Sequence, residues 1–254
     1  MKVKIQSLDG SEKGTTELPP VFDTPIRGDV IRRAVVSAQS ARYQPKAPYD
    51  LAGEQTSAES VGKGRGMARM RRTKSGRHVG AFVAQAVGGH KVHGPKIEKK
   101  IHKKMNKKER MLAIRSAIAA TASPELVAGR GHRINGLEIP IVVPEDFQKI
   151  SKTSEVRDAL LQFGLGDEMD RLVNGRKQRA GKGKSRGRRT RTPKGPLFVV
   201  EPFSPVENAL SNLPGIDVVR IDSLNAEVLA PGGVPGRLSV WTVPALERAG
   251  EIYR

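Results

Sequence analysis

The chain has 254 residues, with 45 lysines and arginines against 26 acidic residues and no cysteine. The lack of cysteine excludes disulfide scaffolds, thiolate catalysis and cysteine-ligated zinc, and it fits an intracellular location. No apolar run approaches the roughly 20 residues that span a bilayer, and residues 1–10 lack the apolar core of a signal peptide. The net charge of +19 calls for a polyanionic partner.

The predicted elements outside the most basic stretches alternate between strands and helices. In chain order they are a strand at 2–6, a helix with apolar positions from 26 to 38, a helix with apolar positions from 111 to 118, a strand at 138–143, a helix from 153, a strand at 196–200, a helix after Ser204, a strand at 216–221, a helix after Asp222, a strand at 237–243 and a closing helix at 244–253. The alternation after residue 138 is typical of βαβ crossovers. It predicts a layered α/β fold whose mostly parallel sheet is flanked by helices.

Two stretches hold all of the excess charge. Residues 44–105, which we call arm one, contain 14 basic and 4 acidic residues, and residues 175–195, which we call arm two, contain 10 basic and none acidic. We therefore predict one nearly neutral globular domain over 1–254 with two inserted arms. Because such segments bury little apolar surface, they are expected to stay disordered until a counter-charge binds. Loops as long as arm one are usually functional or disordered.

RNA or DNA is the obvious source of that counter-charge. Arginine grips phosphate with a planar fork and stacks on bases, while glycine and alanine let the backbone pass through narrow RNA clefts. Membrane docking is disfavoured, because the arms lack the apolar face that interfacial helices bury. The candidate binding residues are Lys63, Arg65, Arg69, Arg71, Arg72, Lys74, Arg77, Lys91, Lys96, Lys99, Lys100, Lys103, Lys104, Arg176, Lys177, Arg179, Lys182, Lys184, Arg186, Arg188, Arg189 and Arg191.

An α/β fold also raises the alternative of a nucleotide-dependent or RNA-modifying enzyme. The phosphate-loop pattern fails because Gln178 stands where its first glycine is required, and the dinucleotide pattern fails at Met67. No nucleophile-elbow motif occurs, and the acidic residues are scattered as on solvated faces. His90, His93 and His102 lack the further ligands that would complete a metal site. We therefore expect no catalytic residue, no cofactor, no metal and no small-molecule substrate.

Three stretches carry a resemblance to a known family. They are GEQTSAESVGKGRGMARM (53–70), AFVAQAVGGHKVHGPK (81–96) and NKKERMLAIRSAIAATA (106–122), the last followed by GHRI (131–134). Their order resembles the universal large-subunit ribosomal protein four family, in its archaeal and eukaryotic form. Eukaryotic members usually carry a long C-terminal extension, and this chain stops at residue 254. The archaeal type is therefore favoured.

The resemblance implies a structural constituent of the large ribosomal subunit in the cytoplasm. Its expected partners are ribosomal RNA, neighbouring large-subunit proteins and, at the tip of arm one, the nascent peptide in the exit tunnel. The tip should fall within residues 62–77, with Met67, Arg69, Met70, Arg71 and Arg72 lining the tunnel. The alternative that remains open is a free RNA-binding regulator that acts on a messenger leader.

Overall fold

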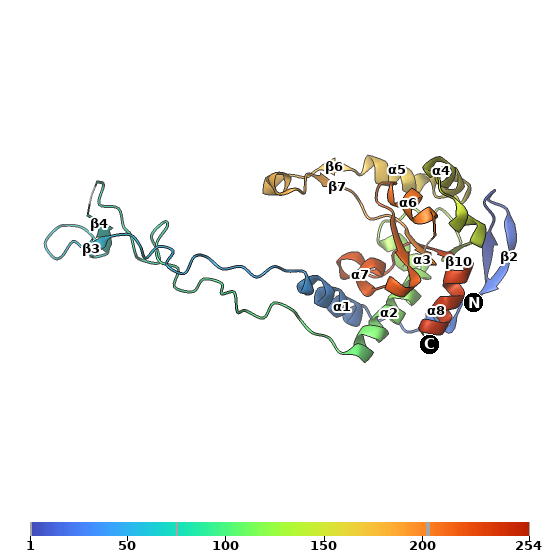
Figure 1. Ribbon diagram of the computed structural model, residues 1–254, viewed down its shortest axis with the longest axis horizontal. Helices are drawn as coiled ribbons and strands as arrows, with labels where there is room; N and C mark the ends of the chain where they lie inside the picture. Colours follow the sequence, from blue (N-terminus) through green and yellow to red (C-terminus); the bar gives the residue numbers. More distant parts are fainter. Residues whose placement is uncertain (1, 75, 202–203, 254) are drawn as a thin grey trace. The chain divides into compact units, whose positions relative to one another are not determined.

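Figure 1 shows the computed structural model, which describes residues 2–74, 76–201 and 204–253. The chain divides into two compact units. One, which we call the sheet unit, comprises residues 1–39 and 104–254; the other, which we call the inserted unit, comprises residues 40–103. Residue 75, within the predicted tip, lies outside the described residues.

The sheet unit is built on a six-stranded sheet in the order β2-β1-β5-β10-β8-β9. Neighbouring strands from β1 to β9 run parallel, and β2 pairs antiparallel with β1 at one edge. The strands are β1 (Lys2–Gln6), β2 (Glu12–Glu17), β5 (Ile141–Val143), β8 (Leu197–Val200), β9 (Asp217–Arg220) and β10 (Ser239–Thr242). The prediction of a mostly parallel sheet is confirmed.

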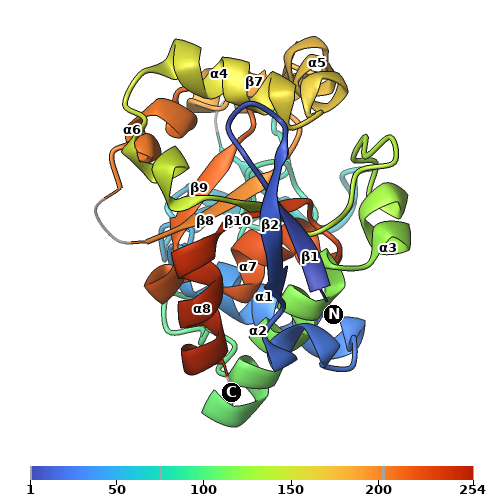
Figure 2. The ribbon, with the colours of Figure 1, turned by 90° about the vertical axis from the view of Figure 1, so that its right-hand side faces the viewer.

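Helices cover both faces of this sheet (Figure 2). They are α1 (Gly28–Ala41), α2 (Lys107–Thr121), α3 (Pro124–Gly129), α4 (Thr153–Gln162), α5 (Gly166–Asn174), α6 (Val206–Ser211), α7 (Ala226–Leu229) and α8 (Val243–Ile252). Short 3₁₀ turns also occur at Pro20–Asp23, Glu145–Lys149, Ile221–Ser223 and Pro231–Gly233. No helix among the described residues has the length and apolar content that crossing a bilayer requires.

The continuously apolar strands contribute side chains to two buried clusters, one on each face of the sheet. Val142 and Trp241 pack into one buried cluster with α1, α2, α7 and α8, while Ile141, Val143 and Val240 pack into a second cluster with α4, α5 and α6. Successive side chains of a strand point to opposite faces, so a strand covered on both sides has apolar residues at every position. This explains why the runs at 138–143 and 196–200 show no alternation.

The sequence prediction missed one strand of the six-stranded sheet and two α-helices beside it. Strand β2 consists of EKGTTE, without the apolar alternation that marks a strand, and it is held at the sheet edge by pairing with β1. Helix α3 has only six residues and buries Val127. Helix α5 does carry an apolar stripe, with Met169 and Leu172 buried, but it directly follows α4 and is separated from it by a single turn at Gly164.

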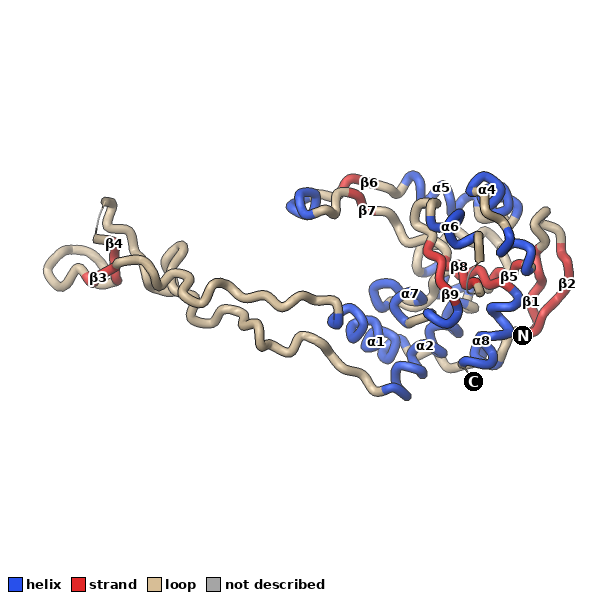
Figure 3. The backbone as a smooth tube through the Cα atoms, in the orientation of Figure 1, coloured by secondary structure: helices blue, strands red, loops and turns tan. Residues whose placement is uncertain are grey.

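The inserted unit has its own small element of regular structure. Strands β3 (Ala58–Ser60) and β4 (Arg71–Thr73) form an antiparallel pair, and most of the remaining described residues form loops and turns (Figure 3). Arm one was expected to lack structure without a partner, so this hairpin is a difference from the prediction. The extended character of the arm and its predicted boundaries stay predictions.

Deleting residues 55–92 is expected to leave a domain that unfolds in one cooperative transition. The reason is that neither buried cluster of the sheet unit contains a residue from this range. Circular dichroism of the deletion protein should show a single thermal transition. Loss of cooperative melting would show instead that the deleted residues belong to the core.

Candidate nucleic-acid interface

Arm two forms a short hairpin after α5. Strands β6 (Lys177–Gln178) and β7 (Thr190–Arg191) pair antiparallel, and a 3₁₀ turn at Gly181–Arg186 lies between them. The Arg179 amide donates to the Arg189 carbonyl at 2.7 Å, and the Arg188 amide donates to the Gly183 carbonyl at 3.0 Å. These bonds give the arm a defined backbone, whereas its composition predicts disorder without a partner.

The candidate cations of arm two are exposed to solvent. Among the described residues, none forms an ion pair with the candidate cations of this arm, and no acidic residue occurs between 175 and 195. An unneutralised row of exposed cations attracts the phosphates of a nucleic acid. The exposed residues are Arg176, Lys177, Arg179, Lys182, Lys184, Arg186, Arg188, Arg189 and Arg191.

We call the two ends of arm two, where it joins the rest of the sheet unit, its roots. The buried carboxylate of Glu168 stabilises the first root, which follows α5. Glu168 on α5 is fully buried and accepts from His132 Nδ1 at 2.7 Å, from the Arg133 amide at 3.1 Å and from Arg171 Nε at 2.7 Å. Burial alone would raise the pKa of Glu168, but the hydrogen bonds from Arg171, His132 and the Arg133 amide outweigh it and lower the pKa to about 2. Arg171 also donates to the Lys194 carbonyl at 2.8 Å, which ties the returning root of the arm to α5.

A second buried network fixes the returning root. Arg237 is fully buried and donates to the carbonyls of Gly195 and Val228, both at 2.8 Å, and to Asp217 Oδ2 at 2.7 Å. Lys194 donates to the same carboxylate oxygen at 2.8 Å. Burial would raise the pKa of Asp217, but Arg237 and Lys194 outweigh it and lower the pKa. Both roots of arm two are therefore anchored in the buried part of the sheet unit.

The inserted unit contains a stack of charged and aromatic groups beside its hairpin. The Arg71 guanidinium lies 4.6 Å from the centre of the Phe82 ring, and Phe82 stacks on His90 with ring centres 5.8 Å apart. His90 Nδ1 in turn lies 2.7 Å from a carboxylate oxygen of Glu54. A cation over an aromatic face is attracted by the ring quadrupole. The stack holds the β4 end of the hairpin against residues 82–90.

The residues predicted to line a tunnel fall into two groups. Met67 and Arg69 are exposed in the turn that precedes β4, whereas Met70 and Arg72 are half-buried. Arg72 donates to the His78 carbonyl at 2.9 Å, and Arg71, although exposed, has its guanidinium over the Phe82 ring. Met67 and Arg69 are therefore the more accessible members of the predicted tip.

The other candidate cations of arm one are exposed. The Lys74 ammonium pairs with Glu59 at 2.7 Å, and the backbone amide of Lys103 donates to the Ser40 hydroxyl at 2.9 Å. The exposed residues are Lys63, Arg65, Lys74, Arg77, Lys91, Lys96, Lys99, Lys100, Lys103 and, at the start of the following segment of the sheet unit, Lys104.

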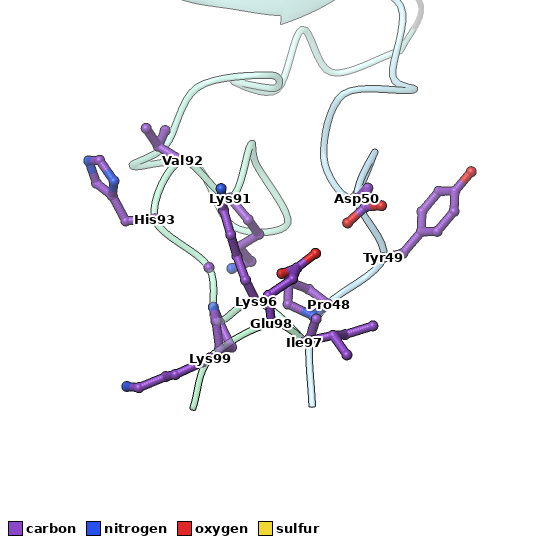
Figure 4. A pocket seen from close by; sticks show the side chains of 13 residues that line it. Pro48, Tyr49, Asp50, Lys91, Val92, His93, Lys96, Ile97, Glu98 and Lys99 are labelled. Atoms are coloured by element: carbon purple, nitrogen blue, oxygen red, sulfur yellow. The ribbon is translucent and has the colours of Figure 1, made fainter. Parts of the chain in front are cut away.

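A groove of about 1050 Å³ lies within the inserted unit, between residues 47–50 and 91–99. Figure 4 shows Lys91 and Lys96 on one side and Pro48 and Asp50 on the other, with Glu98 near its centre. The carboxylates reduce the anion affinity that the lysines provide, so the groove is less suited to phosphate than arm two. Among the described residues, no group of three histidine or acidic side chains is placed to hold a metal ion.

Comparison with known proteins decides the family. The model of the Ribosomal protein L4/L1 family matches residues 16–252. The chain belongs to this family. It is 48% identical over 254 residues to "Large ribosomal subunit protein uL4" of Methanococcus vannielii, with 100% of both chains covered. It is 46% identical over 254 residues to the protein of the same name from Methanosphaera stadtmanae, covering 100% of this chain and 98% of the relative.

The L4/L1 membership confirms the resemblance seen in the sequence, including its archaeal type. What sequence reasoning missed in this L4/L1 chain are the anchors of arm two. The scattered pattern of the acidic residues predicts solvent-facing side chains, which is wrong for Glu168, because this side chain is fully buried. No local sequence pattern indicates the buried contacts of Arg237 either, since its partners Asp217 and Gly195 lie 20 and 42 positions away.

Proposed function

We propose that this L4/L1 member is a non-catalytic structural constituent of the large ribosomal subunit, where it binds and organises ribosomal RNA during translation. The observation that carries the proposal is the exposed basic hairpin of arm two on its two buried anchors. An ordered cationic hairpin can present several phosphate-binding groups at once without losing much conformational entropy on binding. The names of the relatives, which are large ribosomal subunit proteins, support this choice of RNA.

The proposal assigns the candidate cations of both arms to ribosomal RNA and places the protein on ribosomes in the cytoplasm. Its neighbours there are other large-subunit proteins. It requires no cofactor and no small-molecule substrate, since phosphate binding by arginine and lysine needs neither. Phosphate contacts position a protein on RNA, while bases in single-stranded loops supply specificity.

Binding to defined RNAs tests the proposal. The full chain should bind a transcript of a large-subunit ribosomal RNA segment more tightly than it binds a transfer RNA of the same length, at the same salt concentration. A transcript of the chain's own messenger leader separates the main proposal from the alternative of a free regulator. Tight binding to the leader with a defined footprint, without preferred binding to ribosomal RNA, would replace the structural role by the regulatory one.

We further propose that the tip of the inserted unit lines the polypeptide exit tunnel. Met67, Arg69, Met70, Arg71 and Arg72 are the residues concerned, and the exposure of Met67 and Arg69 supports these two most strongly. A cation in a confined passage changes the local potential and so acts on charged groups that pass it.

Charge reversal at the tip is expected to alter elongation without preventing assembly. In Arg69→Glu ribosomes, pausing on nascent segments rich in lysine or arginine should change, because the local potential becomes negative. Ribosome profiling measures this effect, and Arg71→Glu provides a comparison in which the charge is partly engaged by Phe82. A crosslinker at position 69 that reaches RNA but never a stalled nascent chain, with unchanged pausing, would place the tunnel wall elsewhere.

A further inference from the structure

A pocket of about 410 Å³ opens at the root of arm two. One wall is Arg176 and the returning segment 192–194, and the other is the loop 211–217 between α6 and β9. This volume lies in the range of sites that hold small organic ligands, about 300 to 1000 Å³. The lining residues are Arg176, Thr192, Pro193, Lys194, Ser211, Asn212, Leu213, Pro214, Gly215, Ile216 and Asp217.

The two walls are fastened to each other. The Gly195 amide donates to the Gly215 carbonyl at 2.8 Å, and a Cβ atom on Gly215 would lie 2.7 Å from the Pro193 carbonyl oxygen. Gly215 also has a φ of +80°, which favours glycine. Lys194 and Arg237 join the walls through Asp217. The pocket is therefore preformed, and a ligand would not have to order it.

The pocket offers groups suited to each part of a nucleotide. Arg176 supplies positive charge for a phosphate, and Lys194, whose ammonium also pairs with Asp217 at 2.8 Å, adds to it. Pro193, Leu213 and Pro214 supply apolar surface for a base.

A carboxylate oxygen of Asp217 is placed to recognise a ribose hydroxyl. Both described cation contacts of Asp217 use Oδ2, so Oδ1 keeps its capacity to accept a hydrogen bond from a ribose hydroxyl. The Thr192 hydroxyl and the Asn212 amide add further donors and acceptors.

We propose that this pocket binds one unpaired ribonucleotide of the RNA that arm two grips, with its phosphate at Arg176 and Lys194 and its sugar at Asp217. The inference rests on the proposed function and deepens it, because it names the kind of RNA recognised at the root of the arm. The hairpin binds the phosphates of the RNA backbone, whereas the pocket selects an unstacked nucleotide over a paired one. The hydroxyl contact also selects RNA over DNA.

Binding of adenosine 5′-monophosphate to the full chain tests the pocket directly. Titration followed by amide NMR should shift the signals of residues 192–195 and 211–217. The Arg176→Gln change should weaken binding about tenfold, since a hydrogen bond to a charged group is lost. The matched control is Arg157→Gln, at an exposed position of α4 that does not line the pocket, which removes the same charge and should leave the titration unchanged. The 2′-deoxy nucleotide should bind more weakly than the ribonucleotide.

Crosslinking to RNA separates this inference from the proposed function. Ultraviolet crosslinking of the full chain to a large-subunit ribosomal RNA transcript should map an unpaired nucleotide to residues 192–194 or 211–217. Asn212→Ala, at an exposed loop position, provides a second variant that should reduce this crosslink. If the chain binds ribosomal RNA but the monophosphate causes no shifts and no crosslink reaches the pocket, the pocket inference is wrong and the function stands. If the chain does not bind ribosomal RNA at all, the proposed function itself fails.

Discussion

Replacing Arg186, Arg188, Arg189 and Arg191 with glutamine is expected to weaken binding of the full chain to ribosomal RNA by at least about a hundredfold. All four side chains are exposed, so the change should not disturb folding. Each lost phosphate contact should also lower the slope of log affinity against log salt by about 0.7 to 0.9, because fewer counterions are released. Filter binding at several salt concentrations measures the affinity and the slope together.

The matched control removes the same charge from elsewhere on the sheet unit. Lys2, Lys13, Lys149 and Lys152 are exposed and already paired with acidic side chains. Their replacement by glutamine should change the salt slope much less than the arm variant does. An equal slope for the two variants would show that net charge, and not the hairpin, drives binding.

The second large effect is expected at Glu168. Replacing it with glutamine should lower the free energy of unfolding at neutral pH by about 3 kcal/mol, since a buried carboxylate that accepts hydrogen bonds from His132, the Arg133 amide and Arg171 is lost. The folded-state pKa of about 2 lies below the ordinary 4.5. The carboxylate therefore stabilises the fold above pH 4.5, and this contribution is lost as the pH falls towards 2.

Denaturant unfolding between neutral pH and pH 2 measures this dependence. The gap between the wild type and Glu168→Gln should be constant above about pH 5 and should narrow below it. Glu155→Gln serves as the control, because Glu155 is exposed on α4 and pairs only with Lys152 in the described contacts. A gap that stays the same down to pH 2 would contradict an ionised Glu168 in the folded state.

The elements that the sequence predicted well are those whose own residues determine them. The apolar runs of β5 and β8 mark doubly covered strands because burial on both faces leaves no polar position. The two basic arms are likewise visible, since charge can be counted without knowing the fold. The family resemblance is the basis for proposing ribosomal RNA as the polyanion, which composition alone does not indicate.

What the sequence did not reveal depends on contacts between distant segments. Glu168 and His132 are 36 positions apart, and Arg237 meets Gly195 across 42. No local pattern distinguishes such buried charges from the solvated ones around them. The pocket at the root of arm two has the same origin, because its walls at 192–194 and 211–217 meet only in the folded chain. The hairpin of arm two depends on backbone hydrogen bonds that composition does not encode.

Sedimentation of the tagged chain with large ribosomal subunits after a high-salt wash tests the central claim most directly. A structural constituent held by many buried phosphate contacts should remain in the large-subunit fraction at one copy per subunit, while a loosely bound regulator should be released as salt screens its charges. The arm-two glutamine variant should be partly lost under the same wash. Release of the wild-type chain into the soluble fraction, with no copy retained on the subunit, would contradict the structural role.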